Sequence, residues 1–225
     1  MKKVLLLLAF VSCAASVSAQ RAMGHSTSFF SSERADQPIT FGIRAGVNFA
    51  GISEDPIENN FSGKIGYNVG VSVDFPLLES FYMQSGLYFT TKGAKYEKSY
   101  ADYNLKVTAN PFYLQLPILA SYRLNFSEST QLQVNVGPYF AVGLGGKFKD
   151  EEWDTYDYDY EEFNLFGNKD SLLKRGDVGL LIGAGVTFGK VYVGFDYGFS
   201  LMNLSKEPNY SIKNSNFSIN VGYNF

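Results

Sequence analysis

The feature that most constrains this chain is an alternation of apolar and polar residues in eight separate stretches between residues 39 and 225. Successive side chains of a β-strand point to opposite faces, so a period of two indicates strands with one apolar face. In the second stretch Ile65, Tyr67 and Val69 alternate with polar or small residues, whereas Ser85 is the one misfit in the third. The predicted strands are 39–49, 64–75, 81–92, 112–124, 131–144, 177–188, 191–201 and 216–225.

The connections between these strands alternate between long and short. The segments 76–80, 125–129 and 189–190 are short, and the longest connection is 147–175. Bacterial outer-membrane barrels have short periplasmic turns, long external loops and tilted strands of about 9 to 11 residues. The pattern therefore predicts an all-β fold, an eight-stranded antiparallel up-and-down transmembrane β-barrel spanning residues 39–225, with both termini in the periplasm. Pro117 and Pro138 each lack a ladder donor, so a bulge or local irregularity is expected near both.

The last stretch ends the chain on an aromatic residue. Val221, Tyr223 and Phe225 lie on its apolar side and alternate with Gly222 and Asn224. A strand at the end of a sheet leaves an edge of unpaired backbone groups. We therefore expect this strand to close the barrel by pairing with 39–49.

A soluble, lipocalin-like barrel is the main alternative, because it also has eight strands but keeps its apolar side inside. The second face of these strands carries Gly, Asn, Gln, Ser and charged residues, which would make a lipocalin interior too polar and too small. Mean hydropathy of −0.09 does not separate the two folds, because a membrane barrel averages its apolar and polar faces.

The amino terminus predicts export. Lys2 and Lys3 precede an apolar run over 4–11, and Val17-Ser18-Ala19 is a small-residue cleavage pattern, so residues 1–19 are interpreted as a signal peptide. Residues 20–38 are interpreted as a flexible periplasmic lead-in. A lipoprotein cysteine at Cys13 is the less favoured alternative. Cleavage near Ala19 removes the only cysteine, and no remaining run approaches the roughly 20 apolar residues of a membrane helix.

Four motifs support a family resemblance. They are F-Y-L-Q-L-P-I at 112–118, G-P-Y-F-A-V-G-L-G-G-K at 137–147, D-V-G-L-L-I-G-A-G-V at 177–186 and Y-V-G-F-D-Y-G-F-S-L-M-N-L-S at 192–205. The chain resembles the outer-membrane β-barrel domain family labelled porin-family or PorT-like over 39–225. The resemblance implies an eight-stranded outer-membrane barrel without a settled activity, and a terminal signal at Val221, Tyr223 and Phe225 for the barrel assembly machinery. A secretion role known for one member is not carried by these residues.

The charged residues predicted to face the interior do not indicate an enzyme. His25, the only histidine, lies in the lead-in, so a Ser-His-Asp site inside the barrel is excluded and only carboxylate catalysis stays open. No cofactor or metal is expected. We predict a structural lumenal network, in which Arg44 and Asp196 meet at similar depth because a buried charge is costly unless paired. Its members are Arg44, Asp196, Lys64, Asp74, Lys92, Arg123 and Asp177.

Bulky aromatic residues are predicted to fill the interior. Five tyrosines fall on the inward face: Tyr82, Tyr88, Tyr113, Tyr139 and Tyr192. The interior of an eight-stranded barrel is just wide enough for side chains to fill it. A packed polar lumen is therefore expected, with a narrow channel for small solutes or a secretion accessory as the alternatives.

The segment 147–175 contains a dense acidic stretch, which is interpreted as a solvated external loop. Its residues of interest are Asp150, Glu151, Glu152, Trp153, Asp154, Asp157, Asp159, Glu161 and Glu162. A calcium site is less favoured, because no glycine stands at the sharp-turn position of an EF-hand. The mixture of rings and charges suits an external protein or polysaccharide partner. A mature net charge near −5, from the formal −3 less Lys2 and Lys3, argues against nucleic acid, which leaves membrane lipid as the other expected partner.

Overall fold

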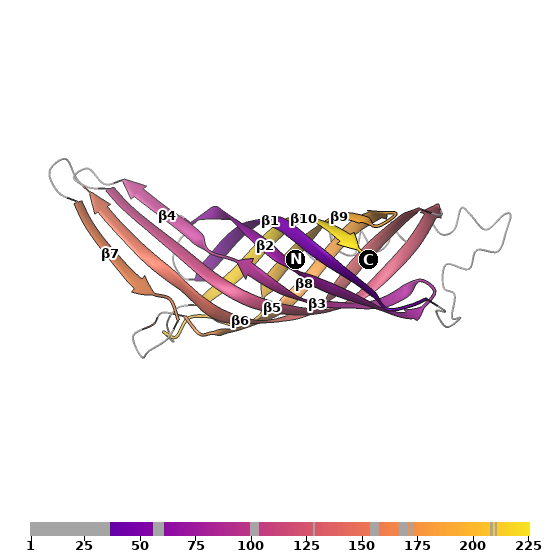
Figure 1. Ribbon diagram of the computed structural model, residues 1–225. Coiled ribbons are helices and arrows are strands. Elements are labelled where there is room, and N and C mark those ends of the chain that lie inside the picture. Colours follow the sequence, from indigo (N-terminus) through magenta and orange to yellow (C-terminus); the bar gives the residue numbers. More distant parts are fainter. Residues whose placement is uncertain are drawn as a thin grey trace.

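The computed structural model describes residues 37–55, 61–99, 104–127, 129–153, 158–166, 171, 173–207, 209 and 211–225. These residues form strands that wind around one barrel (Figure 1). The strands are β1 (Thr40–Asp55), β2 (Phe61–Leu78), β3 (Phe81–Thr91), β4 (Ala94–Ser99), β5 (Asn104–Ser127), β6 (Thr130–Trp153), β7 (Tyr158–Asn164), β8 (Gly176–Phe188), β9 (Val191–Ser200) and β10 (Ser211–Asn224). Among the described residues, no helix is long and apolar enough to cross a membrane.

Eight of the strands close into a ring. The order is β1, β2, β3, β5, β6, β8, β9 and β10, each antiparallel to the next, and β10 returns to β1. The seam runs from the pair Gly42 and Asn224 to the pair Asp55 and Ser211. The eight-stranded up-and-down barrel and the closure of its last strand against its first are confirmed.

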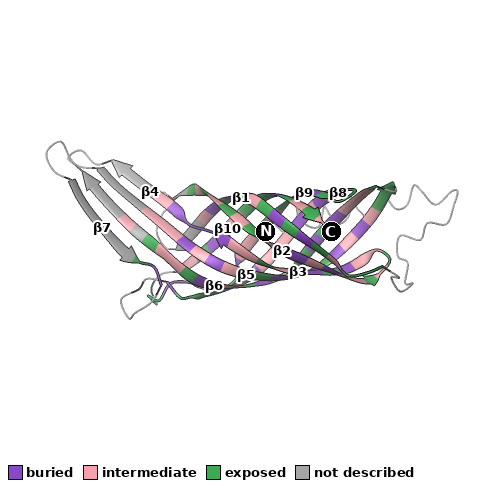
Figure 2. Cartoon of the chain, viewed as in Figure 1, coloured by how far each residue is buried: buried purple, intermediate pink, exposed green. Residues whose placement is uncertain are grey.

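The two faces of the barrel wall have opposite chemistry. Apolar side chains face outward, for example Ile43, Phe195 and Val221, which are 51%, 52% and 56% exposed. Figure 2 shows the resulting alternation of buried and exposed residues along the described parts of the ring strands. Inward positions hold glycine, polar residues and buried rings such as Tyr113 and Tyr139. Because a soluble barrel would place its apolar residues inside, the lipocalin-like alternative is excluded.

Outward rings gather near both ends of the barrel. The short-turn end, where the connections 79–80 and 189–190 lie, has the ring pairs Phe81–Tyr122 and Tyr223–Phe225 at 5.0 and 5.7 Å. The opposite, long-loop end has the pairs Phe49–Phe217 and Phe89–Phe112 at 6.2 and 5.8 Å. Aromatic girdles of this kind flank the apolar band of membrane barrels, which is about 25 Å tall.

The strands at the long-loop end extend further than the alternation predicted. β5 and β6 have 24 residues each, and β4 and β7 lie beside them, so a sheet projects beyond the rim (Figure 1). The prediction that 147–175 is wholly a loop is wrong, because β6 continues to Trp153 and β7 pairs with it through Tyr158. Acidic residues cannot lie in hydrocarbon, but strands that extend beyond the membrane into water can carry them.

A break separates β3 from β4. Beyond the break, β4 takes the place of β3 between β2 and β5. Gly93 lies at the break with φ of +142°, and a Cβ there would be 2.2 Å from the carbonyl oxygen of Ala109. The pairing of β3 with β5 continues past the end of β3, because the backbone N–H of Lys92 donates to the carbonyl oxygen of Pro111 at 3.1 Å. The expected loop between 92 and 112 is therefore largely a second hairpin, formed by β4 and the first half of β5.

The two strand prolines interrupt pairing without shifting it. The β5–β6 ladder skips two positions next to Pro117 and Pro138 and resumes in the same register. Ser85, the misfit in the third predicted strand, donates its hydroxyl to the carbonyl oxygen of Pro117 at 2.8 Å. The irregularity expected at the prolines is thus a gap in the ladder. The register shifts of the β5–β6 pair lie elsewhere, between Phe112 and Tyr113, opposite Leu144, and between Asn125 and Ser127.

Candidate functional site

The long-loop half of the lumen contains a buried ion pair. Lys92 follows the end of β3 and Asp177 lies at the start of β8, and the ring strands β5 and β6 lie between β3 and β8. The Lys92 Nζ lies 3.0 Å from an Asp177 carboxylate oxygen, and the two side chains are 3% and 0% exposed. Both positions were predicted to face inward. The pair links two strands that share no backbone hydrogen bonds.

Neutral polar groups complete the surroundings of this pair. The carboxylate of Asp177 accepts from the hydroxyls of Ser200 and Tyr139, the latter at 3.3 Å, and from the Asn214 amide at 3.4 Å. The Lys92 ammonium also lies 4.4 Å from the centre of the Tyr139 ring. These donors satisfy the oxygens of a carboxylate that is removed from water. Ser200 and Asn214 were not predicted as members, because period two gives the face of a residue and not its neighbour across the lumen.

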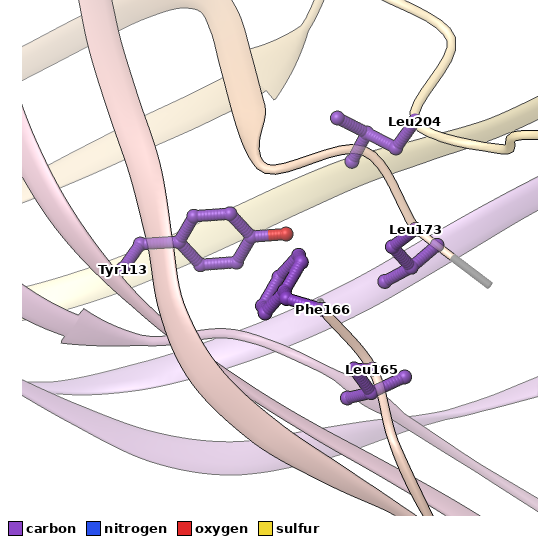
Figure 3. Close-up of a cluster of buried hydrophobic side chains, with 5 residues drawn as sticks. All are labelled: Tyr113, Leu165, Phe166, Leu173 and Leu204. Atoms are coloured by element: carbon purple, nitrogen blue, oxygen red, sulfur yellow. The ribbon is translucent and has the colours of Figure 1, made fainter. Parts of the chain in front are cut away.

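An apolar cluster covers the ion pair at the long-loop end. It consists of Tyr113, Leu165, Phe166, Leu173 and Leu204, all buried. We call these residues the cap. Figure 3 shows the Phe166 ring against Tyr113, with the leucines around them, and the two rings meet edge to face with centres 5.5 Å apart. Three cap residues follow β7 and one follows β9, so the connections fold inward over the lumen.

Backbone contacts hold the two connections of the cap together. Leu173 pairs with Ser205 as an isolated β-bridge, and the N–H of Lys174 donates to the carbonyl oxygen of Leu204 at 2.8 Å. The Lys206 ammonium donates to the Ser171 hydroxyl. The segment 147–175 carries no sustained alternation in this part, so the cap was not predicted.

The short-turn half of the lumen has its own ion pair. Arg123 on β5 lies 2.7 Å from the carboxylate of Asp74 on β2, with exposures of 7% and 3%. The Gln84 amide donates to the same carboxylate at 2.8 Å, and the Arg123 guanidinium lies 4.1 Å from the Tyr82 ring centre. A cavity of about 250 Å³, lined by Arg123, Tyr82 and Thr187, opens beside the pair.

Arg44 and Asp196, which were predicted to meet at similar depth, are not joined by a direct ion pair among the described residues. The Arg44 guanidinium lies 3.6 Å from the Tyr192 ring centre and its Nε donates to Ser72 at 3.3 Å. Asp196 accepts from the Asn220 amide at 2.7 Å. Both side chains line one central cavity. That the two groups lie within about one water of each other stays a prediction.

The central cavity is small. It measures about 60 Å³ and also touches Lys92, Tyr88 and Tyr139. A water occupies about 30 Å³ in the liquid, so this space holds a few waters. Tyrosine rings at 0–2% exposure, Tyr113, Tyr139 and Tyr192, occupy much of the remaining interior. The described part of the lumen is a packed polar core.

Lys64 and the acidic stretch lie outside this core. Lys64 lines a separate cavity of about 420 Å³ at the long-loop end. Asp154 and Asp157 lie outside the described residues, whereas the other acidic positions and Trp153 fall on strands: Asp150, Glu151, Glu152 and Trp153 on β6, and Asp159, Glu161 and Glu162 on β7. Among the described residues no group of three or more His, Cys, Asp or Glu is arranged to hold a metal ion.

The predicted terminal signal lies on the outer face of β10. Val221, Tyr223 and Phe225 are 56%, 42% and 67% exposed. The N–H of Phe225 donates to the carbonyl oxygen of Phe41 at 2.9 Å, which extends the seam to the last residue.

Three solved structures are among those similar to this chain. Ail, the attachment invasion locus protein of Yersinia pestis, is 15% identical, with 84% of this chain and 100% of that chain covered and a TM-score of 0.42. OprG from Pseudomonas aeruginosa is 14% identical, with 86% and 97% covered and a TM-score of 0.46. Neisserial surface protein A is 11% identical, with 84% and 100% covered and a TM-score of 0.42. Among curated proteins no sequence matches the chain.

The family comparison covers most of the molecule. The model described as "Outer membrane protein beta-barrel domain" matches residues 19–206, a range that includes every ring strand except β10. The apolar outer face, the two girdles and the closed ring are what an outer-membrane location requires. The chain belongs to the outer membrane protein β-barrel domain family.

Proposed function

We propose that this outer-membrane barrel is a non-catalytic surface-interaction protein, in which the projecting sheet contacts an external protein or polysaccharide. The observation that carries the proposal is the length of the β5–β6 pair. Its ladder continues to Asn104 and Trp153, far past the long-loop girdle at Phe112. A membrane strand needs only about 9 to 11 residues. The additional length serves a purpose outside the bilayer.

The register of the projecting sheet supports a contact surface. Lys106 on β5 lies opposite Glu97 of β4 on one side and Glu151 of β6 on the other, and opposite charges on neighbouring strands stabilise a sheet. The acidic residues increase toward β7, where Asp159 lies opposite Glu152. A partner with basic or hydroxyl-rich groups suits this acidic, tyrosine-bearing end.

The edge of β7 is available for pairing. β7 is the last strand in the sheet order and pairs, within the described residues, with β6 alone. An unpaired edge can accept an extended segment of another chain, while charges on it limit indiscriminate association. The acidic residues of β7 thus favour a partner of opposite charge.

The narrow-channel alternative is less well supported. A cavity of about 60 Å³ inside the lumen and a cap of five buried residues leave little room for solute passage. The PorT-like assignment rests on the four strand motifs alone, and no residue of this chain argues for a secretion accessory role.

Orientation and processing form part of the same proposal. We infer that residues 1–19 are removed, that 20–38 precede the barrel in the periplasm, and that the short-turn end faces the periplasm. Because Cys13 is the only cysteine, single cysteines at Trp153 and Gly189 can be labelled on cells with a membrane-impermeant maleimide. Trp153→Cys should react on intact cells and Gly189→Cys only after permeabilisation. The reverse result would invert the orientation.

The assembly signal can be tested separately. Phe225→Ala should reduce the amount of folded barrel in the outer membrane, because the assembly machinery is expected to engage Val221, Tyr223 and Phe225. Leu201→Ala, which removes an apolar residue of similar exposure, is the matched control. Equal amounts of both variants would exclude the terminal residue as a signal.

The contact itself is tested with three forms of the barrel displayed on cells. The first is unchanged, the second has a two-residue turn in place of 150–161, and the third keeps the length but replaces the acids of that range by Asn and Gln. Lys149 and Glu162 pair directly in the register, so the shortened hairpin can close there. Partners captured by the first form and lost from both others support the proposal. Identical partners for all three would exclude it.

A further inference from the structure

The cavity of about 250 Å³ at the short-turn end, called the short-turn cavity below, has an exposed rim and a buried floor. Its rim includes Ser127 at the end of β5 and Lys190 in the turn before β9, which are both exposed. Its floor includes Tyr82, Arg123 and Thr187, which are 5%, 7% and 7% exposed. The cavity therefore opens to solvent on one side and ends inside the barrel on buried side chains.

Hydroxyl and amide groups make up most of the lining. The hydroxyls include those of Ser129, Thr130 and Thr187, and the amides include those of Asn125 and Gln131. A hydroxyl both donates and accepts hydrogen bonds, and a side-chain amide offers two donors and an acceptor. The lining thus matches a ligand that carries several groups able to donate and to accept.

Charge contributes little to the selectivity of this cavity. The guanidinium of Arg123 on the floor is balanced by the Asp74 carboxylate 2.7 Å away. Lys190 is at the rim, where its ammonium lies 5.9 Å from the Tyr223 ring centre and is exposed to screening by salt. No side chain that lines the cavity is acidic. The lining therefore favours a neutral ligand over an ion.

The floor presents a polar atom that lacks a partner. The Thr187 Oγ1 is buried and bonds to no group among the described residues. Buried polar atoms of native proteins are nearly always hydrogen-bonded, so this hydroxyl requires water or a ligand in the cavity. Nearer the rim, the Gln131 amide nitrogen donates to the Asn125 amide oxygen at 2.8 Å. That bond leaves the Gln131 oxygen and the Asn125 nitrogen to contact a ligand.

We propose that the short-turn cavity binds the terminal sugar unit of a glycan chain. The Thr187 hydroxyl, the Gln131 amide oxygen and the Asn125 amide nitrogen form hydrogen bonds with the sugar hydroxyls. Sites for most small ligands are lined mainly by apolar side chains, so a lining of hydroxyls and amides favours a sugar over a peptide or a lipid. The buried floor accepts the end of a chain rather than its middle.

This site lies at the opposite end of the barrel from the projecting sheet. Replacement of 150–161 leaves the cavity unchanged, so the sugar site and the surface contact proposed above can fail independently. The hydrogen-bonding groups of the site are the same in either orientation of the barrel. Under the orientation inferred above, the glycan is in the periplasm.

The full chain, in micelles of a detergent without a sugar headgroup, can be titrated with two neutral oligosaccharides, the trimer of N-acetylglucosamine and maltotriose. At least one should bind saturably. Thr187→Val should bind it about three- to tenfold more weakly, as expected for the loss of one hydrogen bond between neutral groups. The double variant Thr187→Val/Gln131→Met should bind at least about tenfold more weakly. Thr108→Val is the matched control, because it makes the same change on β5 at the long-loop end, outside the cavity, and should bind as the unchanged chain does.

Any of three results would overturn the proposal. The first is that neither oligosaccharide binds saturably, which would mean that the cavity holds water only. The second is equal affinity in Thr187→Val and Thr108→Val. The third is binding of tetra-alanine with equal or higher affinity, which would indicate a peptide site. If the variants fail to fold, the methyl signal of Thr187 in NMR spectra of the unchanged chain should shift at a saturating oligosaccharide concentration, and an unshifted signal would contradict a site at this end.

Discussion

The two halves of the lumen each contain one buried ion pair, but their surroundings differ. Lys92 and Asp177 lie at the long-loop end beneath the cap. Arg123 and Asp74 lie at the short-turn end beside an open cavity of about 250 Å³. In the first pair tyrosine, serine and asparagine supply the remaining hydrogen bonds, whereas in the second water can reach the neighbouring space.

The difference shows how an eight-stranded barrel can hold charges in its interior. A pair that is sealed from water must satisfy every polar atom with protein groups, because an unpaired buried charge costs several kcal/mol. In a pair near an opening, water can supply some of the hydrogen bonds that the polar atoms need. Removal of one partner should therefore be much more costly at the sealed end.

The largest effect is expected for Asp177→Asn. The change leaves the Lys92 ammonium buried without its counter-charge, which should lower the free energy of unfolding by about 3 to 5 kcal/mol. Urea unfolding of the barrel refolded in lipid vesicles measures this loss. The double variant Lys92→Met/Asp177→Leu removes both charges and should recover most of the stability. A loss below about 1 kcal/mol for Asp177→Asn would show that water reaches the Lys92–Asp177 pair.

The cap gives the next largest effect. Phe166→Ala removes a buried ring that packs on Tyr113 and over Gly143, and we expect a loss of about 3 kcal/mol, the lower end for such truncations in protein cores. The same variant should conduct ions across planar bilayers more than the unchanged chain, because the lumen loses its cover. Leu201→Ala, at an exposed position, should change neither property. An unchanged conductance in Phe166→Ala would mean that the tyrosines below the cap already close the lumen.

Much of the barrel followed from the period of two. The faces of Lys92, Asp177, Asp74 and Arg123 were predicted correctly, because side-chain direction alternates strictly along a strand. Their partners were not predictable, since Lys92 and Asp177 come from strands that meet only across the lumen. Arg44 and Asp196 come from β1 and β9, which flank β10, and both face the central cavity.

The long-loop end was predicted least well, because two signals conflicted there. The stretch 156–161 alternates tyrosine with acid, which is a strand pattern, yet its charge favoured a loop. The structure makes it part of β7 from Tyr158 onward. The cap residues Leu165, Phe166 and Leu173 are irregularly spaced, so only tertiary packing reveals that they come together.

A smaller effect is expected at the open end of the lumen. Arg123→Met should lower the free energy of unfolding by about 2 kcal/mol, because Asp74 keeps the hydrogen bond from Gln84 and can gain water from the cavity. The same urea experiment applies, with Asp177→Asn as the reference for a sealed charge. Equal losses for the two variants would remove the distinction between the two ends.

The smallest effect is expected for Thr187→Val, which deletes one hydroxyl and keeps the shape of the side chain. Thr187 lines the short-turn cavity and its Oγ1 bonds to no protein group, so we expect a change of less than about 0.5 kcal/mol. The counterpart at the sealed end is Ser200→Ala, which removes a hydroxyl bonded to the Asp177 carboxylate and should cost about 1.5 to 3 kcal/mol. Because both variants remove a single hydroxyl from the lumen, the ratio of the two losses compares a hydroxyl bonded to a buried carboxylate with one that bonds to no protein group. If Thr187→Val proved as destabilising as Ser200→Ala, the Thr187 hydroxyl would have to hold a hydrogen bond in the folded barrel, and the contrast between the two ends would need another cause.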